Sequence, residues 1–172
     1  MPFRLGRRYS NGVMSDSLRL EIITQGPQET EAVGEHLGRA LRGGEIIELS
    51  SDLGGGKTTL VRGVARGAGS SDVVSSPTFT ISKVYTTSRL EIHHFDFYRL
   101  AEAGVMHEEL AELVDDPQVT VLVEWSDIVK DVLPAARLTL RIERMVESED
   151  ARKLILEYPE NLGYLVAAID KN

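Results

Sequence analysis

Residues 45–60 read EIIELSSDLGGGKTTL: a short apolar strand, a glycine-rich turn and Lys-Thr-Thr at the start of a helix. This order is typical of a phosphate-binding loop, because consecutive glycines let backbone N–H groups converge on phosphate oxygens. The N-terminus of the helix adds unsatisfied N–H donors and the positive end of its dipole. In this pattern Lys57 reaches the β- and γ-phosphates and the hydroxyl of Thr58 binds Mg²⁺. The predicted nucleotide-binding residues are Asp52, Leu53, Gly54, Gly55, Gly56, Lys57, Thr58 and Thr59. An ordinary glycine-rich turn is the structural alternative.

One position departs from the G-x-x-x-x-G-K-[ST] pattern. The first glycine is expected at position 51, where this chain has Ser51. A serine can form the turn if its φ is negative, whereas a positive φ would cost about 1–2 kcal/mol. Weaker nucleotide binding or an altered loop would follow from the second case.

The composition is that of one domain which folds without disulfides. A chain of 172 residues buries about 70% of its unfolded surface. The absence of cysteine excludes a thiol nucleophile and cysteine-ligated zinc, and it fits a cytoplasmic protein. The formal charge of −8 argues against binding nucleic acid over the whole surface, although a local basic patch is compatible with it. No apolar run approaches the ~20 residues that span a bilayer.

The hydrophobic periodicity predicts alternating strands and helices through most of the chain. Sequential βα units favour a parallel core, and two predicted hairpins, 79–86 with 90–95 and 137–146 with 152–158, add antiparallel strands. We therefore predict an α/β fold: a P-loop NTPase-like mixed β-sheet with flanking helices, in a single three-layer domain over residues 18–172. Residues 1–17 are predicted to be a disordered N-terminal extension, with an organellar presequence or a start at Met14 as alternatives. The predicted strands are 18–24, 45–50, 79–86, 90–95, 119–125, 137–146 and 152–158, and the predicted helices are 29–41, 57–66, 106–114, 127–132 and 162–169.

Two acids stand where a second Mg²⁺ anchor is expected. Glu124 ends VTVLVE, a run typical of a strand buried on both faces, and would lie at the carboxyl end of a parallel strand. Asp96 ends LEIHHFD and could contact Mg²⁺ through water or orient the attacking water. The alternatives are a solvated glutamate and a turn or cap aspartate. Thr78, in SSPTF, would lie on a mobile loop that senses the γ-phosphate, or would satisfy that loop's backbone.

Other polar residues carry weaker signals. His93 and His94 are adjacent on a predicted strand, so they point to opposite faces and are interpreted as packing or partner contacts. No Asn-Lys-x-Asp guanine reader follows, which favours ATP over GTP. Several arginines could each stabilise charge on the phosphates, and the sequence does not choose among them: Arg62, Arg66, Arg89 and Arg99.

Four segments in this order and spacing resemble the bacterial TsaE family, also called YjeE: SDLGGGKTTLVRG, SSPTFTISKVY, HHFDFYRL and LVEW. The resemblance runs from about residue 18 to the last strands and is weakest near the C-terminus. It implies a mixed-sheet P-loop fold and a Mg²⁺-dependent ATPase needed for threonylcarbamoyladenosine (t6A) modification of tRNA. It also implies action with the TsaD and TsaB proteins, with tRNA met only through that complex.

The resemblance further implies roles for single residues. Lys57 matches the phosphate-binding lysine and Thr58 the Mg²⁺-binding hydroxyl. Asp96 matches an aspartate needed for activity. Glu124 and Trp125 match a Glu-Trp pair, with the acid on Mg²⁺ and the indole near the nucleotide. Thr78 matches the threonine of the switch-like loop.

Two other functions are compatible with a loop of this pattern. A small-molecule kinase would transfer the phosphate to an acceptor, although no arginine-rich lid segment is evident in the sequence. A binding module would use ATP to clamp a partner without hydrolysing it. Phosphate release to water, and its response to TsaB and TsaD, would distinguish the three.

Overall fold

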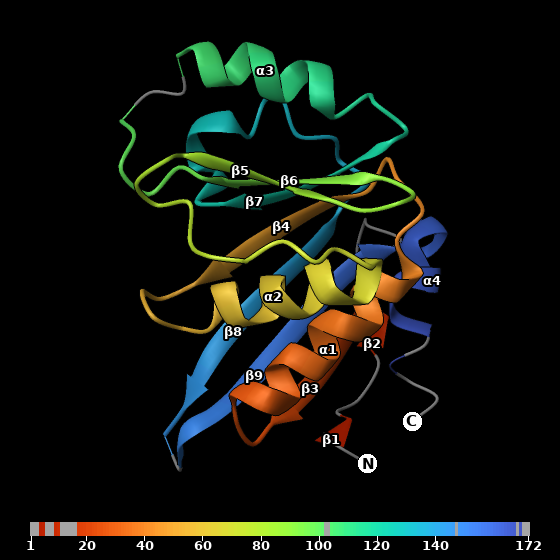
Figure 1. Ribbon diagram of the computed structural model, residues 1–172. Helices are drawn as coiled ribbons and strands as arrows, with labels where there is room; N and C mark the ends of the chain where they lie inside the picture. The colour runs from red at the N-terminus through yellow and green to blue at the C-terminus, as the bar shows by residue number, and fades with distance from the viewer. Residues whose placement is uncertain are drawn as a thin grey trace.

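One β-sheet runs through the whole molecule, with helices packed on both of its faces (Figure 1). The computed structural model describes residues 4–5, 9–10, 17–101, 104–146, 148–167 and 169. The strands in these ranges are β1 (Arg4–Leu5), β2 (Tyr9–Ser10), β3 (Ser17–Thr24), β4 (Ile46–Ser51), β5 (Ser82–Thr86), β6 (Glu91–Asp96), β7 (Val119–Glu124), β8 (Leu138–Met145) and β9 (Ser148–Pro159). The helices are α1 (Pro27–Ala40), α2 (Lys57–Ala68), α3 (Val105–Leu113) and α4 (Gly163–Ala167), with 3₁₀ helices at Ser126–Val129 and Glu160–Leu162.

The sheet is mixed, and its centre is parallel. The strand order is β1-β3-β9-β8-β4-β7-β6-β5, with β2 also paired to β3. Neighbours β8, β4, β7 and β6 run parallel, while the outer pairs are antiparallel. The two predicted hairpins are confirmed as β5–β6 and β8–β9. Because β4, β7 and β6 are parallel, their carboxyl ends meet at one edge, where open α/β sheets bind ligands.

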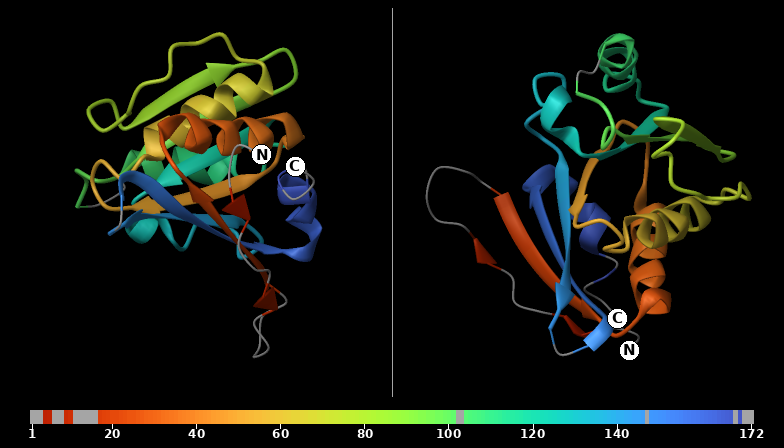
Figure 2. Two further views of the ribbon diagram at one scale, coloured as in Figure 1. Left: turned by 90° about the horizontal axis from the view of Figure 1, so that it is seen from below. Right: turned by 90° about the vertical axis from the view of Figure 1, so that its left-hand side faces the viewer.

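Two apolar cores, one on each face of the sheet, make the three layers that the sequence predicts. The core beneath α1, α2 and α4 includes Leu37, Leu60 and Leu122. The opposite core joins Phe95 and Val123 of the sheet to α3 and to the helix Ser126–Val129. Figure 2 shows the α1–α2 pair on one side of the strands and the helix Ser126–Val129 on the other. The predicted α/β fold with flanking helices is confirmed.

Helices α1 and α2 touch through their backbones. A Cβ added to Gly34 of α1 would lie 2.2 Å from the Leu60 carbonyl oxygen, and one added to Gly63 of α2 would lie 2.0 Å from the Glu31 carbonyl oxygen. Only glycine permits such an approach. This contact fixes α2, and with it the Lys-Thr-Thr turn at the start of that helix.

Some element boundaries differ from the prediction. The strand expected over 79–86 begins at Ser82, because the N–H groups of Thr80 and Ile81 turn back to the Pro77 carbonyl. The helix expected over 127–132 is the 3₁₀ helix Ser126–Val129. Of the extension expected over residues 1–17, β1 and β2 pair with β3, and residues 1–3, 6–8 and 11–16 lie outside the described residues. In the described ranges, no helix has the length and apolar character needed to cross a membrane.

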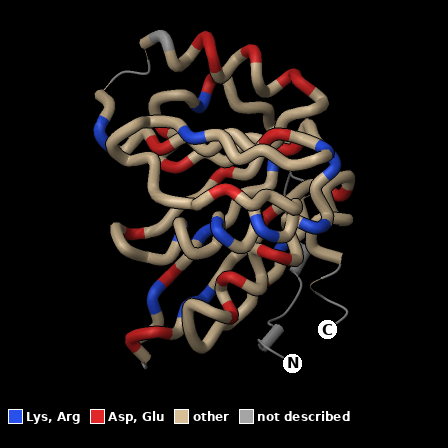
Figure 3. The backbone as a smooth tube through the Cα atoms, viewed as in Figure 1, with Lys and Arg blue, Asp and Glu red and all other residues tan. Residues whose placement is uncertain are grey.

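Acidic and basic side chains are interleaved along the described chain. Figure 3 shows lysines and arginines scattered among the acids, and acids along the turns of α3. This distribution agrees with the overall negative charge of the chain.

Candidate functional site

The predicted phosphate loop connects β4 to α2 at the carboxyl edge of the sheet. Gly56, immediately before α2, has φ 116°, a left-handed conformation that a side chain rarely adopts. The first backbone bond of the helix runs from Leu60 N–H to the Gly56 carbonyl at 3.0 Å. The amides between these residues therefore belong to a free helix N-terminus, the arrangement that binds anions.

Ser51, the residue that departs from the motif, causes no backbone strain. It is the last residue of β4, and its φ is not positive. Its hydroxyl donates to the Asp52 carbonyl at 2.8 Å and accepts from Lys57 Nζ at 3.0 Å. The cost considered for a positive φ does not arise, and the side chain instead holds the lysine.

Two arginines of the β8–β9 hairpin hold the carbonyl side of the loop. Arg144 Nη2 donates to the Leu53 carbonyl at 3.1 Å, and Arg152 Nε donates to the Gly55 carbonyl at 2.9 Å. The two arginines are register partners on adjacent antiparallel strands. Neither arginine was expected at the site from the sequence, because the hairpin lies about 90 residues after the loop. These bonds hold the loop from its carbonyl side, and within the loop the Gly55 N–H donates to the Asp52 carbonyl at 2.9 Å.

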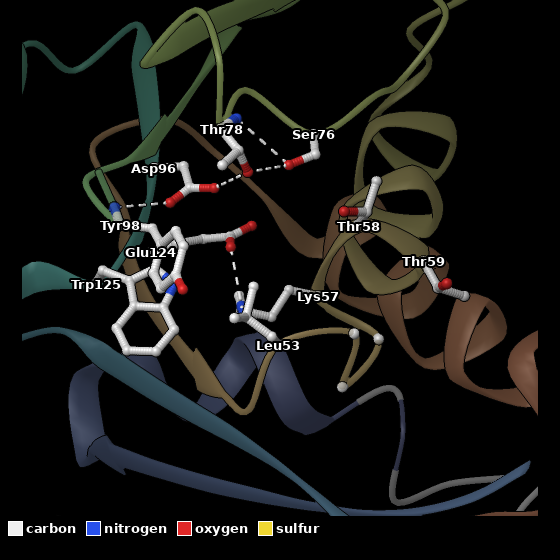
Figure 4. A pocket seen from close by; sticks show the side chains of 13 residues that line it. Leu53, Lys57, Thr58, Thr59, Ser76, Thr78, Asp96, Tyr98, Glu124 and Trp125 are labelled. Atoms are coloured by element: carbon white, nitrogen blue, oxygen red, sulfur yellow. Dashed lines mark hydrogen bonds and ion pairs between the residues drawn. The ribbon is translucent and has the colours of Figure 1, made fainter. Parts of the chain in front are cut away.

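The two predicted acids end adjacent parallel strands. Asp96 of β6 is the register partner of Glu124 of β7, and their exposed fractions are 4% and 3%. Lys57 Nζ lies 3.5 Å from Glu124 Oε2 (Figure 4). Buried carboxylates need compensating charge or hydrogen bonds, and Lys57 supplies positive charge beside Glu124.

The loop before β5 brings one hydroxyl to Asp96 and a second hydroxyl to the first. Thr78 donates its hydroxyl hydrogen to Asp96 Oδ2, and Ser76 Oγ lies 2.6 Å from Thr78 Oγ1. The other carboxylate oxygen accepts from the Tyr98 backbone N–H at 3.0 Å. Thr78 therefore contacts an acid of the site as well as its own loop.

Glu124 has a partner that the sequence analysis missed. His94 is fully buried, and its Nε2 lies 2.9 Å from Glu124 Oε1. Its Nδ1 lies 3.4 Å from the Tyr85 hydroxyl, which donates to the Ser75 carbonyl at 3.1 Å. The expectation that adjacent histidines face opposite sides fits the structure, since His93 instead contacts the exposed carboxylate of Glu91. The packing interpretation omitted the contact of His94 with an acid of the site.

Two strained residues flank the acids. Trp125, directly after Glu124, has φ 57°, and Ile81, whose carbonyl accepts from Asp96 N–H at 2.8 Å, has φ 68°. Positive φ is unusual for such residues and is concentrated at functional sites. The Trp125 ring lies 5.4 Å from Lys57 Nζ and packs against Tyr98.

The glycine-rich loop, the start of α2, the two acids and Trp125 line one pocket of about 230 Å³ (Figure 4). The pocket gathers every predicted site residue except Asp52, and it adds Ser76 and Tyr98. None of the four candidate arginines is among its described lining residues: Arg62 and Arg66 pair with Glu31 of α1, Arg89 with the Leu41 carbonyl, and Arg99 with the Phe79 ring.

The chemistry of the pocket suits Mg²⁺ arriving with phosphates. Thr58, Asp96 and Glu124 offer hard oxygen atoms beside the N-terminus of α2, and a helix N-terminus attracts anions such as phosphate. No three His, Cys, Asp or Glu side chains converge into a metal cage within the described ranges. Mg²⁺ does not require one, because it is usually held by one or two carboxylates, waters and substrate phosphates.

Comparison with known proteins identifies the family. Residues 24–154 match the family model "Threonylcarbamoyl adenosine biosynthesis protein TsaE". The tRNA threonylcarbamoyladenosine biosynthesis protein TsaE of Bacillus subtilis is 37% identical over 135 residues, which cover 76% of this chain and 82% of the relative. The TsaE of Streptomyces coelicolor is 38% identical over 116 residues, 66% of this chain and 78% of the relative. The crystal structure of Bacillus subtilis YdiB superposes with a TM-score of 0.72 at 29% identity, covering 89% of this chain and 95% of that one. With the family model matched over most of the sheet and the whole phosphate loop, the chain belongs to the TsaE family.

Proposed function

We propose that this chain is a Mg²⁺-dependent ATPase that acts with the TsaD and TsaB proteins in the t6A modification of tRNA. One observation supports the proposal. The glycine-rich loop, the hydroxyl of Thr58 at the start of α2 and two adjacent buried acids line the same pocket. The role in t6A modification of tRNA is inferred from the names of the family and of the relatives. The cytoplasm is the expected location, and tRNA is expected to be met through the partner proteins.

Each residue has a task that follows from its place. Loop residues 52–59 would hold the phosphates through backbone N–H groups, with Lys57 on the β- and γ-phosphates. Thr58 and Glu124 would hold Mg²⁺, which would neutralise charge on the phosphates in the transition state. Asp96 would orient the attacking water, and Trp125 would cover the nucleotide.

The most direct test removes the Glu124 charge while keeping its shape. Glu124→Gln should lower ATP hydrolysis about a hundredfold or more, because the metal loses a charged anchor at the reacting phosphate. The affinity for ATP without Mg²⁺ should change little. Glu91→Gln, at the exposed start of β6, is the matched control. Equal hydrolysis by wild type and Glu124→Gln would remove Glu124 from the metal site.

A second experiment addresses the pathway. In bacteria depleted of their own TsaE, the wild-type chain should restore t6A to tRNA and Lys57→Ala should not. Normal t6A after depletion would contradict the proposed function. Phosphate recovered on an acceptor molecule instead of in water would favour the small-molecule kinase.

A further inference from the structure

We infer that His94 is a positioning residue that holds the Glu124 carboxylate in place when Lys57 is drawn to the nucleotide phosphates. This inference rests on the proposed function of the same pocket. It concerns a histidine outside the predicted site, which acts through Glu124 without contacting the nucleotide.

The contact geometry singles out His94. The two oxygens of Glu124 have different partners: Oε1 faces His94 Nε2 at 2.9 Å, and Oε2 faces Lys57 Nζ at 3.5 Å. The contact of Glu124 with His94 is shorter than its contact with Lys57, and the side chains of His94 and Glu124 are both buried. If Lys57 turns to phosphates, His94 is the contact that still holds this carboxylate among the residues that the structure describes.

The register of the sheet explains why His94 reaches Glu124. His94 is paired with Leu122 and Asp96 with Glu124, so all four side chains point to the face that α2 covers. Glu124 lies two residues after Leu122 on β7, so its carboxylate is within reach of the His94 imidazole ring. His93 points to the other face and cannot take this place.

A second contact fixes the imidazole itself. A carboxylate accepts hydrogen bonds only, so the His94 nitrogen that faces it carries a hydrogen. The other nitrogen, Nδ1, lies 3.4 Å from the Tyr85 hydroxyl. Tyr85 is buried and donates to the Ser75 carbonyl, at the start of the loop that bears Thr78. The Tyr85 ring, whose centroid lies 6.2 Å from that of the imidazole, packs against His94 and limits the rotation of its ring.

Two amide substitutions test the inference with matched polarity. His94→Gln places an amide N–H where Nε2 lies and can still donate to Glu124. His94→Asn has the shorter reach of Nδ1 and faces Tyr85 instead. His93→Gln, on the opposite face of the same strand, is the control. All of these variants carry a polar side chain, so a difference between Gln and Asn at position 94 reports the bond to Glu124.

The readout uses the only tryptophan of the chain, Trp125, which lines the pocket next to Glu124. Mg²⁺ is titrated into protein saturated with a non-hydrolysable ATP analogue, and the fluorescence of Trp125 is followed. His94→Asn should need about ten times more Mg²⁺ than wild type and should hydrolyse ATP about tenfold or more slowly, the range found when a partner of a metal ligand is lost. His94→Gln should stay within about threefold of wild type, and all variants should bind the analogue alike without Mg²⁺.

A wild-type Mg²⁺ response in His94→Asn, or an equal loss in the Asn and Gln variants, would overturn the inference. Failure of the proposed function would look different. In that case the wild-type chain itself would release no phosphate from ATP in the presence of TsaB and TsaD.

Discussion

Replacing Gly63 by alanine should separate the two helices that position the phosphate loop. Gly63 lies in the middle of α2, and a Cβ there would stand 2.0 Å from the Glu31 carbonyl oxygen and 2.9 Å from the Glu35 amide nitrogen. Both atoms belong to the backbone of α1, so no side chain can rotate away to make room. The helices would have to move apart, or α2 would have to shift along its axis.

The expected size of the effect follows from two opposing terms. Overpacking a close contact costs about 1–3 kcal/mol, and a rigid backbone obstacle places this site at the upper end. Alanine regains about 1 kcal/mol of helix propensity relative to glycine. The free energy of unfolding should therefore fall by about 2 kcal/mol.

A second helical glycine provides the control. Gly163 begins α4 with an ordinary φ of −57°, and an added Cβ would meet nothing closer than Tyr158 Cε2 at 3.9 Å. Gly163→Ala should be neutral or stabilise the fold by up to about 1 kcal/mol. Urea unfolding at equal m-values measures both variants. A Gly63→Ala protein as stable as wild type would refute the reasoning that backbone contact sets the α1–α2 spacing.

Three further perturbations follow from contacts at the site. Ser51→Ala removes a hydrogen-bond acceptor of the Lys57 ammonium and should lower the free energy of unfolding by about 1 kcal/mol, measured by urea unfolding. Ser50→Ala, at the exposed neighbouring position, should leave the free energy of unfolding unchanged. Arg152→Gln frees the Gly55 carbonyl and should weaken ATP binding several-fold in calorimetric titration, with unchanged affinity arguing that the loop holds its shape alone. Burial raises the pKa of Tyr85 from 10.0 to about 12, so between these values the unfolded chain loses a proton that the folded chain keeps. Stability should therefore fall as pH rises from 10 to 12, by about 2–3 kcal/mol more in wild type than in Tyr85→Phe.

Local sequence patterns were sufficient for the fold and for much of the pocket. The apolar run 45–50, the glycines and Lys-Thr-Thr specify strand, turn and helix within sixteen residues, and each feature depends on near neighbours only. Glu124 could be placed because a buried apolar strand that ends in an acid puts this acid at the sheet's carboxyl edge. The family resemblance added Trp125, which no local pattern would have brought to the pocket.

The residues that were missed depend on contacts between distant segments. Strand alternation predicts that His94 and His93 face opposite sides, but not which of them shares a face with Glu124. That choice needs the β6–β7 register, and a slip of one residue would reverse it. Arg144 and Arg152 are ordinary alternating strand residues until the β8–β9 hairpin folds against the loop. Their functions are visible only when the sheet order is known.

Ser51 shows how a departure from a motif can be matched elsewhere in the same loop. At the sequence level the serine is an isolated exception in a glycine-rich turn. In the fold its side chain fills space beside Gly55, where an added Cβ would lie 2.6 Å from Ser51 Oγ and 2.7 Å from Ser51 Cβ. The side chain of Ser51 therefore leaves room only for glycine at position 55. The hydroxyl also accepts from Lys57, which gives the lysine a neutral partner beside Glu124. The loop thus holds its own lysine in place through a side chain of the same loop, and such preorganisation lowers the cost of ordering a side chain on binding.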